Sequence, residues 1–219
     1  MTTSIHIIGD STAAKKLPDA RPESGWGEFL HLYLSGKYDV QNHAVNGRST
    51  KSFIDEGRFE IVADALTAGD YLFIQFGHND QKVEDPERFT EPFGSYQENI
   101  SQFIATAQEK DAIPIVLTSV SRRTFQDGML DPLTLGDYPL AAMALADELD
   151  VQFIDVFGQS QDLLQTLGEE KSKELFLHLS EGEHTNYPEG VLDDTHFNES
   201  GAKTIANLIA KEFSMLITN

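Results

Sequence analysis

Three short and almost uninterrupted apolar runs constrain the fold of this chain more than any other feature. They read IHII, YLFIQF and IPIVLT, and β-branched and aromatic residues are frequent in them. Strands of this kind are typically covered on both faces, as in a parallel sheet enclosed by helices. With two less apolar segments, they predict five strands, at residues 4–8, 38–42, 70–76, 113–119 and 151–155.

Helical patterns separate the predicted strands. The last helix is predicted at residues 198–216, with Asn198 as its N-cap and with apolar residues on one face at Ala202, Ile205, Ala206, Ile209, Ala210 and Phe213. The other helices are predicted at residues 26–36, 58–67, 95–110 and 137–149. Such alternation predicts an α/β protein, a three-layer α/β/α sandwich around a parallel sheet of about five strands with right-handed crossovers. With 219 residues and no evident linker, we expect a single domain over residues 1–219.

Composition narrows the classes of function. The chain contains no Cys, which excludes disulfides, thiolate nucleophiles and Cys-ligated metals. Its formal net charge of −20 makes nucleic acids and anionic membranes poor partners. The first apolar segment is too short for a signal-peptide core, and no stretch is long enough to span a bilayer, so we expect a cytoplasmic protein.

Several common motifs are absent from the sequence. There is no G-x-S-x-G elbow, which argues against an ordinary α/β-hydrolase. There is also no G-x-G-x-x-G, no P-loop and no H-E-x-x-H, which argues against nucleotide enzymes and zinc proteases. Ligands of open α/β sheets bind beyond the carboxyl ends of the strands, so the segments that follow the strands matter most. These segments read GDST, HAVNGRST, GHNDQ, VSRRTF and VFGQS, and an irregular stretch at 178–196 precedes the last helix.

A nucleophile and a base are available at these strand ends. Ser11 directly follows the first strand, and a Ser hydroxyl becomes a nucleophile only when a neighbouring base removes its proton. Asp193 and His196 lie three residues apart, so the carboxylate can hold the imidazole in one tautomer within a turn. The alternatives are a helix cap or turn for Ser11, and a turn-stabilising pair or a metal site for the other two. The metal alternative would use His78, Asp80, Asp193, Asp194 and His196.

Donors for a developing oxyanion follow the second and third strands. Gly47 can offer an unobstructed N–H, and Asn79 can offer its side-chain NH2 group. The N–H of Ser11 would be a third donor. Each of these residues is also an ordinary turn residue, so the evidence lies in the set and in its order along the chain.

The motifs GDST, NG, GHND and DDTH, in this order, resemble the four sequence blocks of the SGNH (GDSL-like) hydrolase superfamily. The resemblance covers the whole chain and implies a flavodoxin-like α/β/α fold. It implies that Ser11 is the nucleophile, that His196 is the general base and acid, and that Asp193 orients His196. It also implies an oxyanion hole made of Ser11, Gly47 and Asn79. A mechanism of this kind needs no metal and no cofactor.

One branch of the superfamily is more similar than the others. The chain has Asp-Ser-Thr where many family lipases have Asp-Ser-Leu, and GDSTAA, GWGEF, QFGHND, SVSRRTF and DDTHFNESGA resemble the rhamnogalacturonan acetylesterases. This resemblance implies a serine esterase that removes O-acetyl groups from pectic oligosaccharides. Arg122 and Arg123 follow the fourth strand, and either would suit a galacturonate carboxylate; a surface ion pair is the alternative.

Other functions remain open at this point. A broader carbohydrate acetylesterase, a lysophospholipase or a thioesterase would keep the same serine chemistry. A non-catalytic sugar-binding module would make the site residues incidental. We expect Trp26 and Phe197 to pack in the core, and His78 and Asp80 to hold the loop around Asn79.

Overall fold

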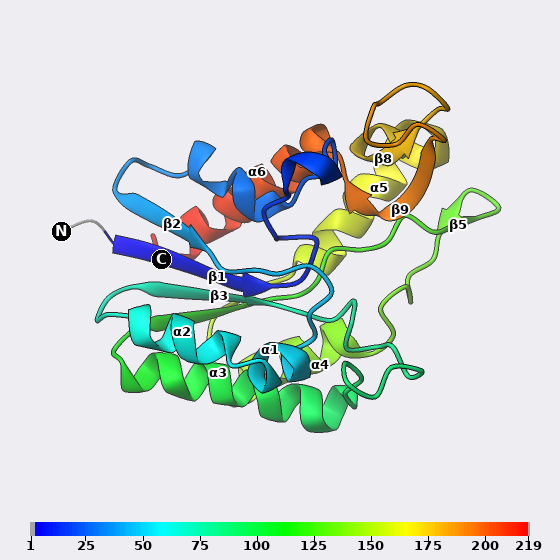
Figure 1. Cartoon of the computed structure of the whole chain (residues 1–219). Coiled ribbons are helices and arrows are strands. Elements are labelled where there is room, and N and C mark those ends of the chain that lie inside the picture. Colours follow the sequence, from blue (N-terminus) through cyan, green and yellow to red (C-terminus); the bar gives the residue numbers. More distant parts are fainter. Residues whose placement is uncertain (1–2, 219) are drawn as a thin grey trace.

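The computed structural model describes residues 3–218 and contains the predicted α/β fold (Figure 1). Within these residues a five-stranded parallel sheet has the strand order β2-β1-β3-β4-β7. This is the order of flavodoxin-like sheets, in which the second strand lies outside the first. The strands are β1 (Thr3–Gly9), β2 (Tyr38–Asn42), β3 (Tyr71–Gln75), β4 (Ile113–Leu117) and β7 (Phe153–Ile154). All five predicted strands are therefore confirmed, with ends shifted by two residues or fewer.

Helices cover both faces of the sheet, as the uninterrupted apolar strands predict (Figure 1). One face packs against α1 (Thr50–Asp55), α2 (Arg58–Ala65), α3 (Gln97–Glu109) and α4 (Tyr138–Glu148). The other face packs against α5 (Val156–Ser172), α6 (Glu199–Leu216) and the segment around Trp26. Asn198 caps α6 as predicted, since its side chain accepts from the N–H of Gly201 at 3.1 Å.

Three predictions about local structure are wrong. Residues 26–36 form no α-helix but two 3₁₀ turns, Trp26–Glu28 and Leu30–Leu32. The reason is close backbone packing, because a Cβ on Gly25 would lie 2.1 Å from the carbonyl oxygen of Ala14. The segment VFGQS is not a loop but the start of α5, whose N-cap Asp155 accepts from the N–H of Gly158 at 3.0 Å.

The stretch at 178–196 is not irregular, in contrast to the prediction from its sequence. It contains most of an antiparallel pair, β8 (Phe176–Leu179) and β9 (Val191–Phe197), outside the central sheet. A further hairpin joins β5 (Phe125–Gln126) to β6 (Met129–Leu130). Strands β5, β8 and β9 lie beyond the carboxyl edge of the central sheet (Figure 1).

The register of the sheet brings distant segments to that edge. Gly9 of β1 pairs with Gln75 of β3, so both strands end at the same level. The chain therefore delivers Ser11 and Asn79 to neighbouring positions at the carboxyl edge. None of the helices in the described part of the chain is both long and apolar enough to cross a membrane.

Candidate active site

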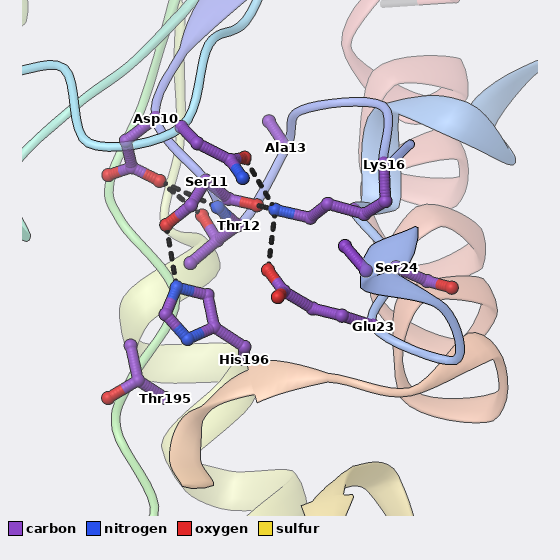
Figure 2. Close-up of polar contacts among 12 residues, drawn as sticks. Asp10, Ser11, Thr12, Ala13, Lys16, Glu23, Ser24, Thr195 and His196 are labelled. Carbon is purple, nitrogen blue, oxygen red and sulfur yellow. Dashed lines mark hydrogen bonds and ion pairs between the residues drawn. The ribbon is translucent and has the colours of Figure 1, made fainter. Parts of the chain in front are cut away.

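Ser11, His196 and Asp193 form one continuous chain of contacts at the carboxyl edge of the sheet. Ser11 Oγ lies 2.8 Å from His196 Nε2 (Figure 2), and His196 Nδ1 lies 2.7 Å from Asp193 Oδ2. When Nδ1–H donates a hydrogen bond to the carboxylate, Nε2 keeps a lone pair that can accept the Ser11 hydroxyl proton. The arrangement can therefore activate a hydroxyl nucleophile.

A bulge in β9 produces the contact between Asp193 and His196. Leu177 and Phe176 are consecutive in β8, yet they pair with Asp193 and Phe197, so residues 194–196 bulge out of the ladder. Within the bulge, Asp193 Oδ1 accepts the N–H groups of Thr195 at 2.7 Å and His196 at 2.9 Å. The turn-like contact expected from the spacing is thus present, although the segment is a strand.

The charge of Asp193 is strongly favoured by these contacts. Burial by itself would raise the pKa of this carboxyl, but hydrogen bonds from the His196 side chain and from the two backbone N–H groups outweigh it and lower the pKa to about 2. Asp193 is therefore a carboxylate at neutral pH, as a group that stabilises an imidazolium must be.

The structure brings Gly47 and Asn79 close to each other through Arg48. Asn79 is buried, and its Nδ2 donates to the carbonyl oxygen of Arg48 at 3.0 Å, which leaves the second N–H of the amide available. Gly47 has a φ of +76°, a left-handed conformation that favours glycine. That Gly47 and Asn79 donate hydrogen bonds to an oxyanion stays a prediction.

Buried polar side chains flank Ser11 and Asn79 along the chain. Asp10 Oδ1 accepts from the N–H of Thr12 at 2.9 Å and from its hydroxyl at 2.7 Å, while Oδ2 lies 3.4 Å from His78 Nδ1. Burial would raise the pKa of Asp10, but His78 and Thr12 hold it below its usual value. His78 is buried, but neither of its ring nitrogens has a hydrogen-bond partner among residues 3–218, so its expected role in holding the loop stays a prediction.

Asp80 directly follows Asn79 and is also fully buried, but its pKa is shifted in the opposite direction to that of Asp10. Its Oδ1 accepts from the N–H of Thr50 at 3.0 Å, from the hydroxyl of Thr50 at 2.6 Å and from that of Thr90 at 3.0 Å. Burial raises its pKa to about 7 in spite of these hydrogen bonds. Asp80 connects the start of α1 to the loop after β3, which agrees with its expected role.

The two arginines after β4 have different surroundings. Arg123 is buried and donates to Ser172 Oγ at 3.0 Å, Asp194 Oδ1 at 2.6 Å and the Glu169 carbonyl oxygen at 2.5 Å. These partners within its own chain favour the ion-pair alternative for Arg123, although the pair is buried on the arginine side and not on the surface.

Arg122 is half-buried beside the Ser11–His196 contact. It donates to Thr195 Oγ1 at 3.1 Å and to the His78 carbonyl oxygen at 3.4 Å, and its Nε is buried without a partner among residues 3–218. Arg122 therefore remains the better placed of the two arginines for contact with a substrate.

Residues 3–218 contain no group of three or more His, Asp or Glu side chains arranged to hold a metal ion. Of the acidic residues in the metal alternative, Asp80 binds threonines and Asp194 binds Arg123 and His178. The expected core positions of Trp26 and Phe197 agree with their burial.

Two site residues escaped sequence reasoning. Lys16 is buried and donates to the carbonyl oxygen of Ser11, and Asp10 is buried and accepts from the N–H of Thr12. Nothing local marks Lys16, because the stretch AAKKL resembles an exposed basic turn. Asp10 belongs to the GDST motif, and that position was the available signal.

Comparisons with known proteins agree on family and fold. The chain matches the GDSL-like Lipase/Acylhydrolase family over residues 7–204. It is 44% identical over 207 residues to the rhamnogalacturonan acetylesterase RhgT of Bacillus subtilis (strain 168), covering 94% of this chain and 88% of that protein. It is 37% identical over 214 residues to the probable rhamnogalacturonan acetylesterase YesY of the same strain, covering 96% and 92%. The crystal structure of protein YxiM from Bacillus subtilis superposes with a TM-score of 0.81 at 25% identity, over 99% of this chain and 57% of that one.

Proposed function

Since the chain belongs to the GDSL-like lipase/acylhydrolase family, we propose that it is a serine esterase that removes O-acetyl groups from pectic oligosaccharides of the rhamnogalacturonan type. The observation that carries the proposal is the 2.8 Å contact between Ser11 Oγ and His196 Nε2, continued to Asp193. The extensive similarity to RhgT and YesY supports the substrate class.

The first half of the proposed reaction acetylates the enzyme. His196 Nε2 removes the Ser11 hydroxyl proton as Oγ attacks the acetyl carbonyl carbon. The N–H groups of Ser11 and Gly47 and the amide of Asn79 stabilise the oxyanion of the tetrahedral intermediate. When the intermediate collapses, the bond to the sugar oxygen breaks and His196 gives its proton to the leaving hydroxyl group.

The second half releases acetate. His196 removes a proton from a water molecule, whose oxygen attacks the acetyl carbon of acetyl-Ser11. The same donors stabilise the second oxyanion, and the proton returns from His196 to Ser11 Oγ as acetate leaves. Throughout, Asp193 holds Nδ1–H of His196 and stabilises the imidazolium that forms twice per cycle.

Arg122 supplies the proposed recognition of a uronate carboxylate. Its guanidinium lies between Thr195 and the loop of His78, and both segments belong to the site. Arginine binds a carboxylate through two parallel hydrogen bonds, which suits the galacturonate units of the proposed substrate. The cytoplasmic location and the single-domain organisation stay predictions.

The test compares acetate release from acetylated rhamnogalacturonan oligosaccharides, acetylated xylan and p-nitrophenyl acetate. We expect the pectic substrate to give the highest kcat/KM, EDTA to have no effect, and Ser11→Ala to lower kcat on the order of 10⁶-fold. A circular dichroism spectrum equal to that of the wild type would show that the variant is folded.

Each contrary result removes a defined part of the proposal. Cleavage of p-nitrophenyl acetate alone would keep the serine chemistry and contradict the pectic substrate. A preference for xylan would indicate a broader carbohydrate acetylesterase. Turnover that survives Ser11→Ala and is lost with EDTA would favour the metal alternative, and binding of the oligosaccharide without turnover would indicate a sugar-binding module.

A further inference from the structure

Lys16 is a fully buried cation next to the proposed nucleophile. Its side chain is 0% exposed, and its Nζ donates to the carbonyl oxygen of Ser11 at 2.5 Å and to Asn46 Oδ1 at 2.7 Å. Its third contact is an ion pair with Glu23 Oε1 at 2.8 Å (Figure 2). An ammonium group has three N–H donors, so these three acceptors satisfy it completely.

Such a residue is costly to bury unless its charge is compensated. Lysine is seldom buried, and an unpaired ammonium in the interior would be strongly destabilising. Glu23 supplies the opposite charge, and its own side chain is only 15% exposed. The burial of a whole ion pair is a weak source of stability, because desolvation offsets the attraction. The arrangement therefore calls for an explanation other than stability.

The Ser11 end of this contact fixes a peptide group of the site. The Ser11 carbonyl is held by Lys16, and the N–H of the same peptide, that of Thr12, is held by Asp10 Oδ1 at 2.9 Å. The preceding carbonyl, that of Asp10, accepts from the N–H of Ala14 at 3.0 Å. In a trans peptide the N–H points opposite to the carbonyl, so this bond directs the Ser11 N–H out of the turn.

The other end of the contact holds the side chain of the residue that precedes the second proposed donor, Gly47. Lys16 holds the side chain of Asn46, and the carbonyl oxygen of Asn46 accepts from Arg48 Nη1 at 2.8 Å. The N–H on the opposite side of that peptide belongs to Gly47. Lys16 thus joins the Ser11 segment to the Asn46–Gly47 segment. It lies five positions after Ser11 and 30 positions before Asn46 in the sequence.

We propose that Lys16 is a positioning residue that holds the N–H groups of Ser11 and Gly47 in register for the oxyanion. The inference rests on the proposed esterase function, because these donors are assigned from the acyl-transfer reaction proposed for Ser11. Lys16 does not touch the reacting atoms; it acts through the two backbone segments. A misplacement of catalytic groups by about 1 Å can cost a factor on the order of 10² in rate, so the loss should appear in kcat rather than in KM.

The experiment measures kcat and KM on p-nitrophenyl acetate for three single variants beside the wild type. Lys16→Met removes the ammonium and keeps an unbranched side chain. Glu23→Gln removes the charge of the ion pair and leaves both contacts of Lys16 to the site. Lys15→Met removes the same positive charge from the exposed neighbouring position and is the matched control.

We expect Lys16→Met to lower kcat about 10- to 100-fold with KM within about twofold of the wild type. Glu23→Gln should lower the melting temperature about as much as Lys16→Met and keep kcat within about threefold. The inference is overturned if folded Lys16→Met keeps kcat within about threefold, or if Glu23→Gln and Lys16→Met lose kcat equally. Equal losses would mean that the ion pair acts only through stability.

A chemical variant keeps the test decisive if Lys16→Met does not fold. The chain has no Cys, so Lys16→Cys introduces a single thiol. Alkylation of the unfolded variant with 2-bromoethylamine, followed by refolding, restores an ammonium at nearly the same distance from the backbone. We expect this adduct to recover most of kcat and the neutral iodoacetamide adduct to recover little; equal recovery by both adducts would overturn the inference.

Failure of the inference can be told apart from failure of the proposed function. If the wild type cleaves no acetyl ester, the proposed function fails. The rate of labelling of Ser11 by a fluorophosphonate, followed by mass spectrometry, then replaces kcat, because its phosphoryl oxygen develops charge in the same donors. An active wild type with an equally active Lys16→Met would contradict the role of Lys16 alone.

Discussion

Ser11 and His196 lie in contact, yet the segments that carry them are held in different ways. The Ser11 segment, residues 9–16, bonds to the 3₁₀ turn at Trp26, whose N–H donates to the Thr12 carbonyl at 2.9 Å, and the side chains of Asp10, Thr12 and Lys16 are buried. Strand β9, which carries His196, lies on a separate two-stranded sheet, and the side chains of Asp193 and His196 are 27% and 28% exposed.

This difference separates two kinds of cost. A polar change in the Ser11 segment leaves buried groups without their hydrogen-bond partners, which lowers the free energy of unfolding as well as the rate. Asp193 is partly exposed to solvent, so the cost of a polar change there should fall mainly on the chemistry, with a smaller loss of the stability that its charge provides. Strand β9 is held instead at its last residue, where Phe197 packs on Phe176, and in its middle, where the N–H of Arg123 donates to the Asp194 carbonyl at 2.8 Å.

The largest expected effect tests the claim for strand β9. Asp193→Asn leaves a neutral amide beside His196 Nδ1, which no longer holds the reactive tautomer, and we expect kcat to fall about 10⁴-fold. The melting temperature at pH 7 should fall modestly, because the variant also loses the stability that the charge of Asp193 provides. Asp194→Asn is the neighbouring control, and because Asp194 binds Arg123 and His178, it should lose stability while keeping most of its kcat. A loss of kcat in Asp194→Asn equal to that in Asp193→Asn would contradict the assignment.

Asn79→Ala tests a buried residue of the loop after β3, where we expect losses of both rate and stability. Removal of one oxyanion donor costs about 10²–10³-fold in kcat in enzymes of this kind, and we expect a loss of that size. Because Asn79 is buried and donates to the Arg48 carbonyl, the variant should also unfold at a lower temperature. Unimpaired hydrolysis by the variant would remove Asn79 from the mechanism.

The pH dependence of stability tests whether the buried carboxyl of Asp80 keeps its proton in the folded protein. The folded-state pKa of Asp80 is about 7 and its ordinary value is 3.8, so the folded protein keeps a proton that the unfolded chain has lost. Stability should therefore fall as the pH rises from about 4 to about 7, and this group contributes a loss of about 3 kcal/mol between pH 5 and pH 8.

Urea unfolding at pH 5 and pH 8 measures this contribution. Asp80→Asn cannot ionise and should remove most of that difference, whereas the exposed Asp64→Asn should leave it unchanged. Asp193 has the opposite sign, because its pKa of about 2 gives stability that is lost only below about pH 4. An Asp80→Asn variant with the same pH dependence as the wild type would show that Asp80 is ionised in the folded protein.

The smallest expected effect concerns the two arginines. Arg122→Met should raise KM for the pectic substrate about tenfold, the value of one charge-assisted hydrogen bond, with a smaller change on p-nitrophenyl acetate. Arg123→Met should instead lower the melting temperature, because Asp194, Ser172 and Glu169 lose their shared donor. The reverse pattern would exchange the roles assigned to the two residues.

Sequence patterns predicted the parts of the fold that leave a repeated local signal. The strands β1, β3 and β4 are apolar on both faces, and α6 repeats an apolar residue at every turn, so each was recognised. Helix α5 escaped recognition because only Val156, Ser160, Leu164 and Ser172 are buried in it, which leaves a weak apolar stripe. The turns around Trp26 were mistaken for a helix because close backbone packing, which local sequence does not record, decided their form.

The order of the short motifs also predicted Ser11, Asp193 and His196 as partners, but only the tertiary structure decided what surrounds them. Ser11 and His196 are 185 residues apart, and Arg123 and Asp194 are 71 apart. Lys16 belongs to a stretch, AAKKL, that resembles an exposed turn, and it is nevertheless buried and bonded to the Ser11 carbonyl. The physical reason is that hydrophobic periodicity reflects how a single helix or strand faces the core, so it can be read locally. The partner of a buried charge comes from a segment that is distant in the sequence, so it depends on the tertiary structure.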